Sequence, residues 1–362
     1  MRRSEVNDML KYKKPSRNFI TYAACIVAFL ICQLALSGVI DGFKMSRSLK
    51  GQLVPICVYI VMAVSLNLTV GISGELSLGH AGFMSVGAFS GILVSQYLLL
   101  AFPDVNLEFV RLLSALLFGG VMAAVAGVLI GIPVLRLRGD YLAIVTLAFG
   151  EIIRNLLNCV YFAVDGRALN FAFLDPNLPG KLIINGPMGA TGIKKLATFE
   201  VGFLLVMFTL VVVLNLINSR SGRAIMAIRD NRIAAESVGI NVTKYRMLAF
   251  VVSAALAGMA GALYGLNFSQ IQAVKFKFDT SILVLVFVVL GGIGNISGSI
   301  IAAAVLTVLP EMLRQFGNYR MLIYAIVLIL VMLVSNNPTL MSMLDSLKGK
   351  LLRKNGKEDD QA

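Results

Sequence analysis

The chain has 362 residues, of which 58% are hydrophobic and 14% charged, with a mean hydropathy of +0.84 and a net charge of +13. This composition excludes a soluble globular protein, because several apolar runs reach the ~20 residues that cross a bilayer core. The Lys and Arg residues lie in short loops and tails, which is typical of membrane orientation signals and argues against a nucleic-acid partner. Backbone polar groups in lipid need internal partners, so we expect an all-α, polytopic transmembrane protein.

Ten candidate spans follow one another between polar breaks. They cover residues 19–40, 51–72, 78–100, 111–134, 140–158, 199–218, 246–267, 280–293, 296–313 and 321–335. Joining the eighth and ninth spans across the GGIGN break (Gly291–Asn295) would leave nine and separate the two basic tails. With ten spans, 19 Lys and Arg residues lie on the side of the tails and 12 on the other, so both termini are predicted to be cytoplasmic.

These spans define the expected domain organisation. A basic cytoplasmic N-terminal tail (1–18) precedes a transmembrane domain (19–336), and a cytoplasmic C-terminal tail (337–362) follows it. The first apolar run is too long for a typical signal-peptide core, so we expect a retained helix. Residues 161–198 mix charges with Pro and Gly, which predicts an external surface loop.

Spans four and nine resemble each other. Residues 120–139 and 299–317 share small residues, a late proline and a following Leu-Arg pair. Because five spans separate them, their directions in the membrane would be opposite. This pattern is consistent with an inverted repeat, as found in transporters, and also with chance similarity between apolar segments.

Glycine and polar residues are dense where the second span meets the third. The stretch VGISGELSLGHAGFMSVGAFSG (Val70–Gly91) carries Ser73, Glu75, Ser77 and His80. Glycines allow a helix to break, and the freed backbone groups survive in a membrane only beside protein or water. Broken helices meet polar solutes in many transporters, so these four side chains are candidates for lining a translocation path. The alternative is a tight turn at the membrane surface with Glu75 and His80 in solvent.

The GGIGN break is the second place where the path could be lined. It ends in Asn295, which is therefore a further candidate. Like Asn67, this residue lies at the end of a span beside glycines, where an amide side chain also suits simple helix-end hydrogen bonding. Both roles remain open at this point.

Two opposite charges fall inside span five. Glu151 and Arg154 are three residues apart and share one helix face. Because a charge within a membrane is costly, each is a functional candidate. The simpler interpretation is an intramembrane ion pair in which the two charges neutralise each other.

Span seven is rich in small residues spaced four apart. One strip holds Ala254, Gly258 and Ala262, and the next holds Ala257, Gly261 and Gly265. Since lipid provides no hydrophobic drive for helix association, such strips indicate close backbone packing rather than a ligand site.

A polar segment of basic character precedes span seven. The sequence SRSGRAIMAIRDNRIAAESVGINVTKYR occupies residues 219–246. We predict one helix over 222–238 whose buried face holds Ile225, Ile228, Ala235 and Val238. The simplest alternative is an amphipathic helix resting on anionic lipid.

The sequence also indicates where that helix ends and where the next helix begins. Gly239 suits the position just after the helix, where a left-handed backbone is needed. Asn241 or Thr243 is placed to cap the helix that follows.

Catalytic patterns are scarce. The chain has no G-x-x-x-x-G-K-[ST] phosphate loop, one His and no Cys–His pair. We therefore expect neither an enzyme nor a bound cofactor or metal.

Four stretches together resemble the branched-chain amino acid permease subunits of ABC importers, and specifically the M-type member of the paired permeases. They are GISGELSLGHAGFMSVGAF (71–89), LRLRGDYLAIVTLAFGEIIRN (135–155), GRAIMAIRDNRIAAESVGINVTKYRMLAFVVSAALAGMAGALYG (222–265) and LGGIGNISGSIIAAAVLTVLPEMLR (290–314). The resemblance covers much of residues 50–335.

The resemblance implies that residues 219–246 are the segment that couples the permease to its ATPase. Importers of this kind generally carry Glu-Ala-Ala, three residues and Gly. Here Ala234, Ala235 and Gly239 match, whereas Ile233 stands in the Glu position, which puts an acidic role there in doubt. The basic side chains of the same segment are further coupling candidates, namely Arg223, Arg229 and Arg232.

The resemblance also implies partners and a location. It predicts a second, homologous permease subunit, two cytoplasmic ABC ATPase subunits that hydrolyse ATP, a solute-binding protein outside the membrane, amino-acid substrate and surrounding lipid. The membrane would be the cytoplasmic membrane of a prokaryote. Alternatives are an ABC permease for urea or a sugar, and a secondary transporter coupled to ions through Glu75, His80 or Glu151.

Overall fold

The computed structural model describes most of the chain between the two tails. The described residues are 21–22, 25–30, 32–33, 47–101, 108–137, 139–165, 168–175 and 178–336. The predicted tails at 1–18 and 337–362, and much of the predicted first span at 19–40, lie outside them. The chain divides into two compact units, residues 1–304 and 305–362.

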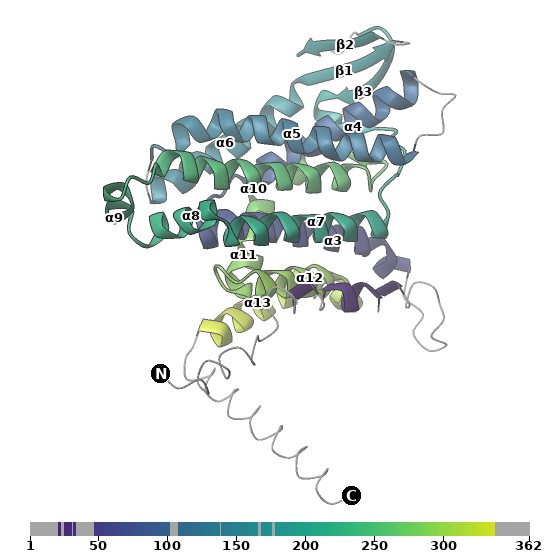
Figure 1. Cartoon of the computed structure of the whole chain (residues 1–362). Helices are drawn as coiled ribbons and strands as arrows, with labels where there is room; N and C mark the ends of the chain where they lie inside the picture. The colour runs from purple at the N-terminus through teal and green to yellow at the C-terminus, as the bar shows by residue number, and fades with distance from the viewer. Residues whose placement is uncertain are drawn as a thin grey trace, which may run out of the picture. The chain divides into compact units, whose positions relative to one another are not determined.

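Helices make up most of the described chain, which confirms the all-α class (Figure 1). The α-helices are α3 (Arg47–Asn67), α4 (His80–Ala101), α5 (Glu108–Val134), α6 (Asp140–Asn158), α7 (Phe199–Asn218), α8 (Arg220–Asp230), α9 (Arg232–Ser237), α10 (Val242–Gly265), α11 (Phe278–Gly291), α12 (Ile296–Met312) and α13 (Arg320–Asn336). One π-helix, η1 (Leu68–Ile72), continues α3. The 3-10 helices are η2 (Gly186–Met188), η3 (Ala273–Phe276) and η4 (Leu313–Tyr319).

The predicted number of ten spans is not confirmed. Among the described residues, six helices are long and apolar enough to cross a membrane. The helices α11 and α13 contain shorter apolar stretches. Helix α6 matches the predicted residues 140–158, but it carries Glu151 and Arg154 and is not among the six. Helices were therefore predicted more reliably than membrane crossings.

A small sheet replaces the loop that was predicted for residues 161–198. Its five antiparallel strands lie in the order β2-β1-β3-β4-β5. The strands are β1 (Val160–Asp165), β2 (Ala168–Phe173), β3 (Lys181–Asn185), β4 (Ala190–Thr191) and β5 (Gln270–Ile271). Because β5 follows α10, the sheet ties two distant stretches of the chain together.

Helices α4, α5 and α10 form the packed centre of the first unit, as the small residues of span seven predicted. A Cβ at Gly258 of α10 would lie 2.6 Å from the carbonyl oxygen of Gly119 in α5. Likewise, a Cβ at Gly119 would lie 2.9 Å from the carbonyl oxygen of Gly87 in α4. The three backbones are therefore too close for larger side chains at these points, which confirms the predicted close packing.

Helix α7 connects the two polar ends of the first unit. It follows the sheet at its N-terminus and leads directly into α8 at its C-terminus, so the sheet and the α8–α9 segment lie at opposite ends of α7 (Figure 1). Its 20 residues span about 30 Å at the rise of an α-helix. An α7 that crosses the bilayer thus places the sheet and the α8–α9 segment on opposite sides of the membrane.

Candidate functional site

The segment 219–246 forms a helical hairpin rather than the single helix predicted for residues 222–238. Helix α8 ends at Asp230, because Asn231 adopts an extended backbone with φ −153° and ψ 104°. The side chain of Asn231 then accepts a hydrogen bond from the backbone N–H of Ala234 at 3.1 Å and so begins α9. We call residues 219–241 the hairpin, and α9 with the following turn its tip.

The break at Asn231 changes which residues are buried. Ile228 and Ala235 pack with Val242 in one cluster inside the hairpin, and Ile225 packs in another, so three of the four predicted face residues are buried. Val238 is 75% exposed, which corrects the prediction that it shares their face. The reason is that α9 ends at Ser237, so Val238 is the residue after the helix, with φ −92° and ψ 13°, and no longer follows the face of Ala235.

The tip therefore presents small and apolar groups to its surroundings. Ile233 is 80% exposed, and Ala234 and Gly239 are exposed as well. Gly239 has φ +82°, the left-handed conformation predicted for the residue after the helix. Asn241 caps α10 by accepting a hydrogen bond from the backbone N–H of Lys244 at 3.1 Å, as one of the two predicted alternatives.

The three basic coupling candidates occupy different surroundings. Arg223 is exposed on α8. The Nε of Arg232 donates to Oε1 of Glu236 at 2.9 Å, one turn along α9. Arg229 pairs with Asp230 at 3.0 Å, and its Nη1 also donates to the carbonyl oxygen of Gly71 at 2.9 Å. Only Arg229 of the three is thus shown in contact with the membrane-spanning part of the chain.

The first predicted break is present between η1 and α4. Residues 73–79 have no helical structure, and Ser73, Glu75, Ser77 and His80 are all at most 4% exposed. This burial corrects the alternative in which Glu75 and His80 face solvent. Among the described residues, the hydroxyls of Ser73 and Ser77 have no hydrogen-bond partner, so their bonding capacity is free inside the protein.

The two charged or titratable side chains of this break have partners. Glu75 forms an ion pair with Arg246 in the second turn of α10. The Nε2 of His80 lies 2.8 Å from the hydroxyl of Ser65 in α3. The backbone carbonyl of Ser65 in turn accepts a hydrogen bond from the hydroxyl of Ser253 in α10 at 2.5 Å. His80 therefore joins a polar link between α3, α4 and α10.

The second predicted break, GGIGN, lies against the first. The side chain of Asn67 accepts a hydrogen bond from the N–H of Gly294 at 2.8 Å and donates one to the hydroxyl of Ser299 at 2.9 Å. A Cβ at Gly71 would collide with the backbone of Gly294. The half-buried Asn295 starts α12, since its carbonyl oxygen accepts from the N–H of Ser299 at 3.1 Å. The fold thus brings the two breaks together.

Glu151 and Arg154 lie apart from both breaks in the sequence. Their side chains approach to 2.7 Å on α6. The Oε1 of Glu151 also accepts a hydrogen bond from the backbone N–H of Phe278 at 3.3 Å, at the start of α11. A carboxylate at a helix N-terminus is favourable, because the free N–H groups there carry partial positive charge. These contacts give the pair a role in attaching α6 to α11.

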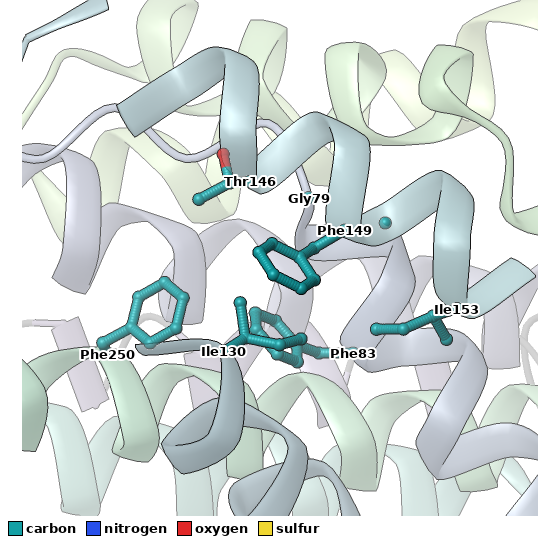
Figure 2. A pocket seen from close by; sticks show the side chains of 8 residues that line it. Gly79, Phe83, Ile130, Thr146, Phe149, Ile153 and Phe250 are labelled. Carbon is teal, nitrogen blue, oxygen red and sulfur yellow. The ribbon is translucent and has the colours of Figure 1, made fainter. Parts of the chain in front are cut away.

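A small apolar pocket adjoins the end of the first break. Figure 2 shows Gly79 beside Thr146, Phe149 and other side chains that come from α4, α5, α6 and α10. Its lining is Gly79, Phe83, Ile130, Thr146, Phe149, Gly150, Ile153 and Phe250. The Thr146 hydroxyl accepts a hydrogen bond from the N–H of Leu78 at 3.0 Å, which fixes the break to α6. None of these lining residues was among the predicted site residues.

Sequence reasoning missed Arg246 as a functional candidate. The predicted span began at this residue, so its charge was assigned to the loop. In the structure α10 begins at Val242, and Arg246 lies inside an apolar helix. The rule that flagged Glu151 and Arg154, that a charge inside a span needs a reason, would have flagged Arg246 if the helix start had been known.

Known proteins resemble this chain over most of its length. The family model described as "Branched-chain amino acid transport system / permease component" matches residues 49–332. The high-affinity branched-chain amino acid transport system permease protein LivM of Escherichia coli (strain K12) is 34% identical, covering 84% of this chain and 72% of the relative. The ribose import permease protein RbsC of the same strain is 26% identical, covering 86% and 92%. No solved structure matches the chain significantly.

An archaeal relative is more distant. The probable branched-chain amino acid transport permease protein LivM of Methanocaldococcus jannaschii is 24% identical, covering 66% of this chain and 74% of the relative. The similarity therefore extends from amino-acid permeases of bacteria and archaea to a bacterial sugar permease.

Proposed function

Because this chain belongs to the family of branched-chain amino acid transport system permease components, we propose that it is the permease subunit of an ATP-driven importer for branched-chain amino acids. It is a multi-pass membrane protein and a non-enzymatic transport subunit, and it works in a complex with other subunits. The observation that carries the proposed mechanism is the hairpin, whose tip is exposed while its base contacts the first break.

The proposed partners follow from this role. They are a second, homologous permease subunit, two cytoplasmic ABC ATPase subunits and an external solute-binding protein. ATP would be hydrolysed by the ATPase subunits, and this chain would bind no cofactor. The complex would lie in the cytoplasmic membrane of a prokaryote, with both termini and the hairpin in the cytoplasm, as the distribution of Lys and Arg predicts.

The tip of the hairpin is the proposed contact with an ATPase subunit. Ala234 and Gly239 expose little bulk, and Ile233 and Val238 beside them are 80% and 75% exposed. Exposed apolar side chains of this size on a polar segment mark a surface that a partner covers. Ala235 would act differently, because it is buried inside the hairpin and holds α9 against α8.

The three basic residues of the hairpin would have two different roles. Arg223 is exposed on α8, where it would meet acidic groups of an ATPase subunit, and the half-buried Arg232 on α9 would do so beside its partner Glu236. Arg229 would instead hold the base of the hairpin to Gly71. Movement of the tip would then reach the transmembrane helices through α10, which packs closely on α4 and α5.

The proposed translocation path runs along the two breaks. Ser73, Glu75, Ser77 and His80 supply polar groups from the first break, and Asn295 supplies an amide from the second. Support comes from the free hydroxyls of Ser73 and Ser77 and from the contact between the breaks. Unwound segments beside each other are where transporters meet polar solutes.

Family membership favours an ATP-driven complex over a secondary transporter that works alone. It also favours amino acids over sugars or urea, since the bacterial amino-acid permease is 34% identical and the ribose permease 26%. The substrate would enter through the external solute-binding protein, which selects it before the permease does.

Reconstitution in liposomes tests this proposal. The chain is co-purified with its partner subunits from its own host and reconstituted with the loaded solute-binding protein. We expect uptake of leucine, isoleucine or valine that requires ATP and both ATPase subunits, and no uptake of ribose. Uptake that is driven by a pH or sodium gradient without the ATPase subunits would contradict the proposal.

A further inference from the structure

Two arginines, one on each side of the hairpin tip, reach the same break. Arg229 is near the end of α8, before the tip, and Arg246 is in α10, after it. Arg229 donates to the carbonyl oxygen of Gly71 at 2.9 Å, and Arg246 pairs with Glu75. The first contact thus lies in the last turn of η1 and the second lies four residues further on, in the break, whereas the two arginines are seventeen residues apart on either side of the tip.

Arg229 gives the Gly71 carbonyl a hydrogen bond, and Arg246 compensates the charge of Glu75, whose carboxylate oxygens accept no hydrogen bond from the described residues. Gly71 lies in the last turn of η1, where a carbonyl oxygen has no partner further along the helix. The side chain of Glu75 is 2% exposed, and an unpaired carboxylate buried to that degree is strongly destabilising. The planar guanidinium suits both roles, because it donates several hydrogen bonds in fixed directions.

The stem of Arg229 also packs on the break. A Cβ at Gly74 would lie 2.7 Å from Cγ of Arg229. Gly74 has φ +75°, so the glycine permits both the turn of the backbone and the close approach of the arginine. The hairpin therefore contacts the break through the packed stem of Arg229 as well as through the hydrogen bond of Arg229 to Gly71.

From Ser73 to Ser77 the break turns its polar side chains inward. Ser73, Glu75 and Ser77 are buried, whereas Gly74 and Leu76 between them are exposed. Buried and exposed residues thus alternate from Ser73 to Ser77, so one side of this irregular segment lies inside the protein. The inner face carries two free hydroxyls and one carboxylate, which pairs with the charge of Arg246 but accepts no hydrogen bond from the described residues.

We propose that Arg229 and Arg246 are positioning residues that clamp this break closed at the end of the path nearest the hairpin. Displacement of the hairpin would pull on Gly71 through Arg229 and separate the break from Arg246, which stays in α10, and so open the inner face, on which Ser73 and Ser77 lie, to solvent. Glu75 is then the attachment point of the clamp rather than a ligand for substrate in the closed state. The inference rests on the proposed function only in that a partner subunit displaces the hairpin.

Thiol labelling tests the clamp. A cysteine replaces Ser77 in a chain whose four native cysteines are changed to serine, and the complete complex is studied in lipid nanodiscs, where both faces are accessible. Without nucleotide, we expect maleimide to label this cysteine slowly when Arg246 is present. The change Arg246→Gln should accelerate labelling at least tenfold, because the carboxylate loses its partner and the break separates from α10.

A matched position controls for general loosening. Ser253 is 1% exposed and lies in α10 outside the break. A cysteine at Ser253 should stay slow with and without Arg246→Gln. Equal acceleration at both positions would show that the variant unfolds the helix bundle and would contradict a local clamp, as would unchanged labelling of the cysteine at Ser77.

A charge exchange separates the ion pair from a merely structural arginine. The variant Glu75→Arg with Arg246→Glu should restore slow labelling, because the pair is rebuilt in reverse. Labelling as fast as with Arg246→Gln alone would overturn the proposal. Glu75→Gln is a second variant that keeps the side-chain shape and removes the charge, and it should also accelerate labelling of the cysteine at Ser77.

The labelling and uptake experiments fail independently. Labelling without nucleotide measures the clamp in the resting complex, whatever the substrate is. If the unaltered complex showed no ATP-driven uptake of amino acids, the proposed function would be contradicted, whereas the clamp would not be affected. Normal ATP-driven uptake with unchanged labelling in Arg246→Gln would overturn only the clamp.

Discussion

Two glycines of this chain are required for opposite reasons. Gly258 lies in the packed centre of α4, α5 and α10, where a Cβ would lie 2.6 Å from a carbonyl oxygen of α5. Gly239 lies at the hairpin tip, where a Cβ would meet nothing within 4 Å but the backbone has φ +82°. Neighbouring atoms exclude a side chain at the first glycine, and backbone conformation disfavours one at the second.

The difference separates two mechanical roles. A region in which backbones touch moves as one body, because interiors at this density transmit displacement rather than absorb it. The conformation of an exposed tip is set by its own backbone, and its contacts with other groups come from a partner subunit. Substitutions in the centre should therefore act on stability, and substitutions at the tip should act on coupling.

The largest effect on stability is expected at Gly258. The change Gly258→Ala places a methyl group against the backbone of α5 and forces the helices apart, at a cost of about 1–3 kcal/mol. Gly51→Ala in α3 is the matched control, because a Cβ at Gly51 would meet nothing within 4 Å. Thermal unfolding of the purified complex in detergent should show a lower midpoint for Gly258→Ala only. Equal midpoints would contradict the close packing.

A smaller cost is expected at Gly239. The change Gly239→Val forces a β-branched residue into the left-handed region at about 1–2 kcal/mol and distorts the turn between α9 and α10. We expect normal membrane insertion and abolished ATP-driven uptake. Gly239→Asn is the control, because asparagine tolerates this conformation, and it should keep most of the uptake. Normal uptake by Gly239→Val would count against the tip as the coupling contact.

The cap between the two short helices should contribute about 1 kcal/mol. The change Asn231→Ala removes the hydrogen bond to the N–H of Ala234 and should loosen α9 without affecting the centre. Hydrogen exchange should become roughly fivefold faster in α9, as expected for that free energy. Asn231→Asp keeps an accepting oxygen and should exchange at the original rate. Faster exchange throughout α10 would show that the hairpin and the centre are not separable.

Hydropathy and glycine content predicted most helices and both breaks. The apolar runs set the extents of α6 and α7 to the residue, and the interruption at GGIGN separated α11 from α12. Small residues on α10 correctly indicated close packing, because their four-residue spacing is visible in a single helix. These features depend on residues that are close together in the chain, and for that reason they can be predicted from the sequence.

The remaining features depend on distant residues. The pairing of β4 with β5 was missed because these strands have two residues each and come from stretches far apart in the chain. The division at Asn231 was missed because the apolar spacing on either side suits one continuous helix. The pair of Glu75 with Arg246 joins the first break to the second turn of α10, two segments that no sequence pattern relates. The fold alone brings these groups together.

The smallest effect on stability, and the clearest contrast with Gly258, is expected at Ile233. This side chain is 80% exposed, so Ile233→Ser should change stability by no more than about 0.5 kcal/mol. If an ATPase subunit covers it, the same change should weaken binding by about 1.5–3 kcal/mol, the value of burying such a side chain. Titration of the purified ATPase against the permease in nanodiscs measures the affinity.

The control for Ile233 must be equally apolar and lie at the other end of α7. Met188 in η2 is 56% exposed and belongs to the sheet region, so Met188→Ser should leave ATPase affinity unchanged. A loss of affinity in Ile233→Ser alone, with unaltered thermal unfolding, would show that the tip serves a partner and not the fold. Equal affinity of both variants would mean that Ile233 faces lipid or solvent, and the contrast between the two regions would then rest on Gly239 and its backbone.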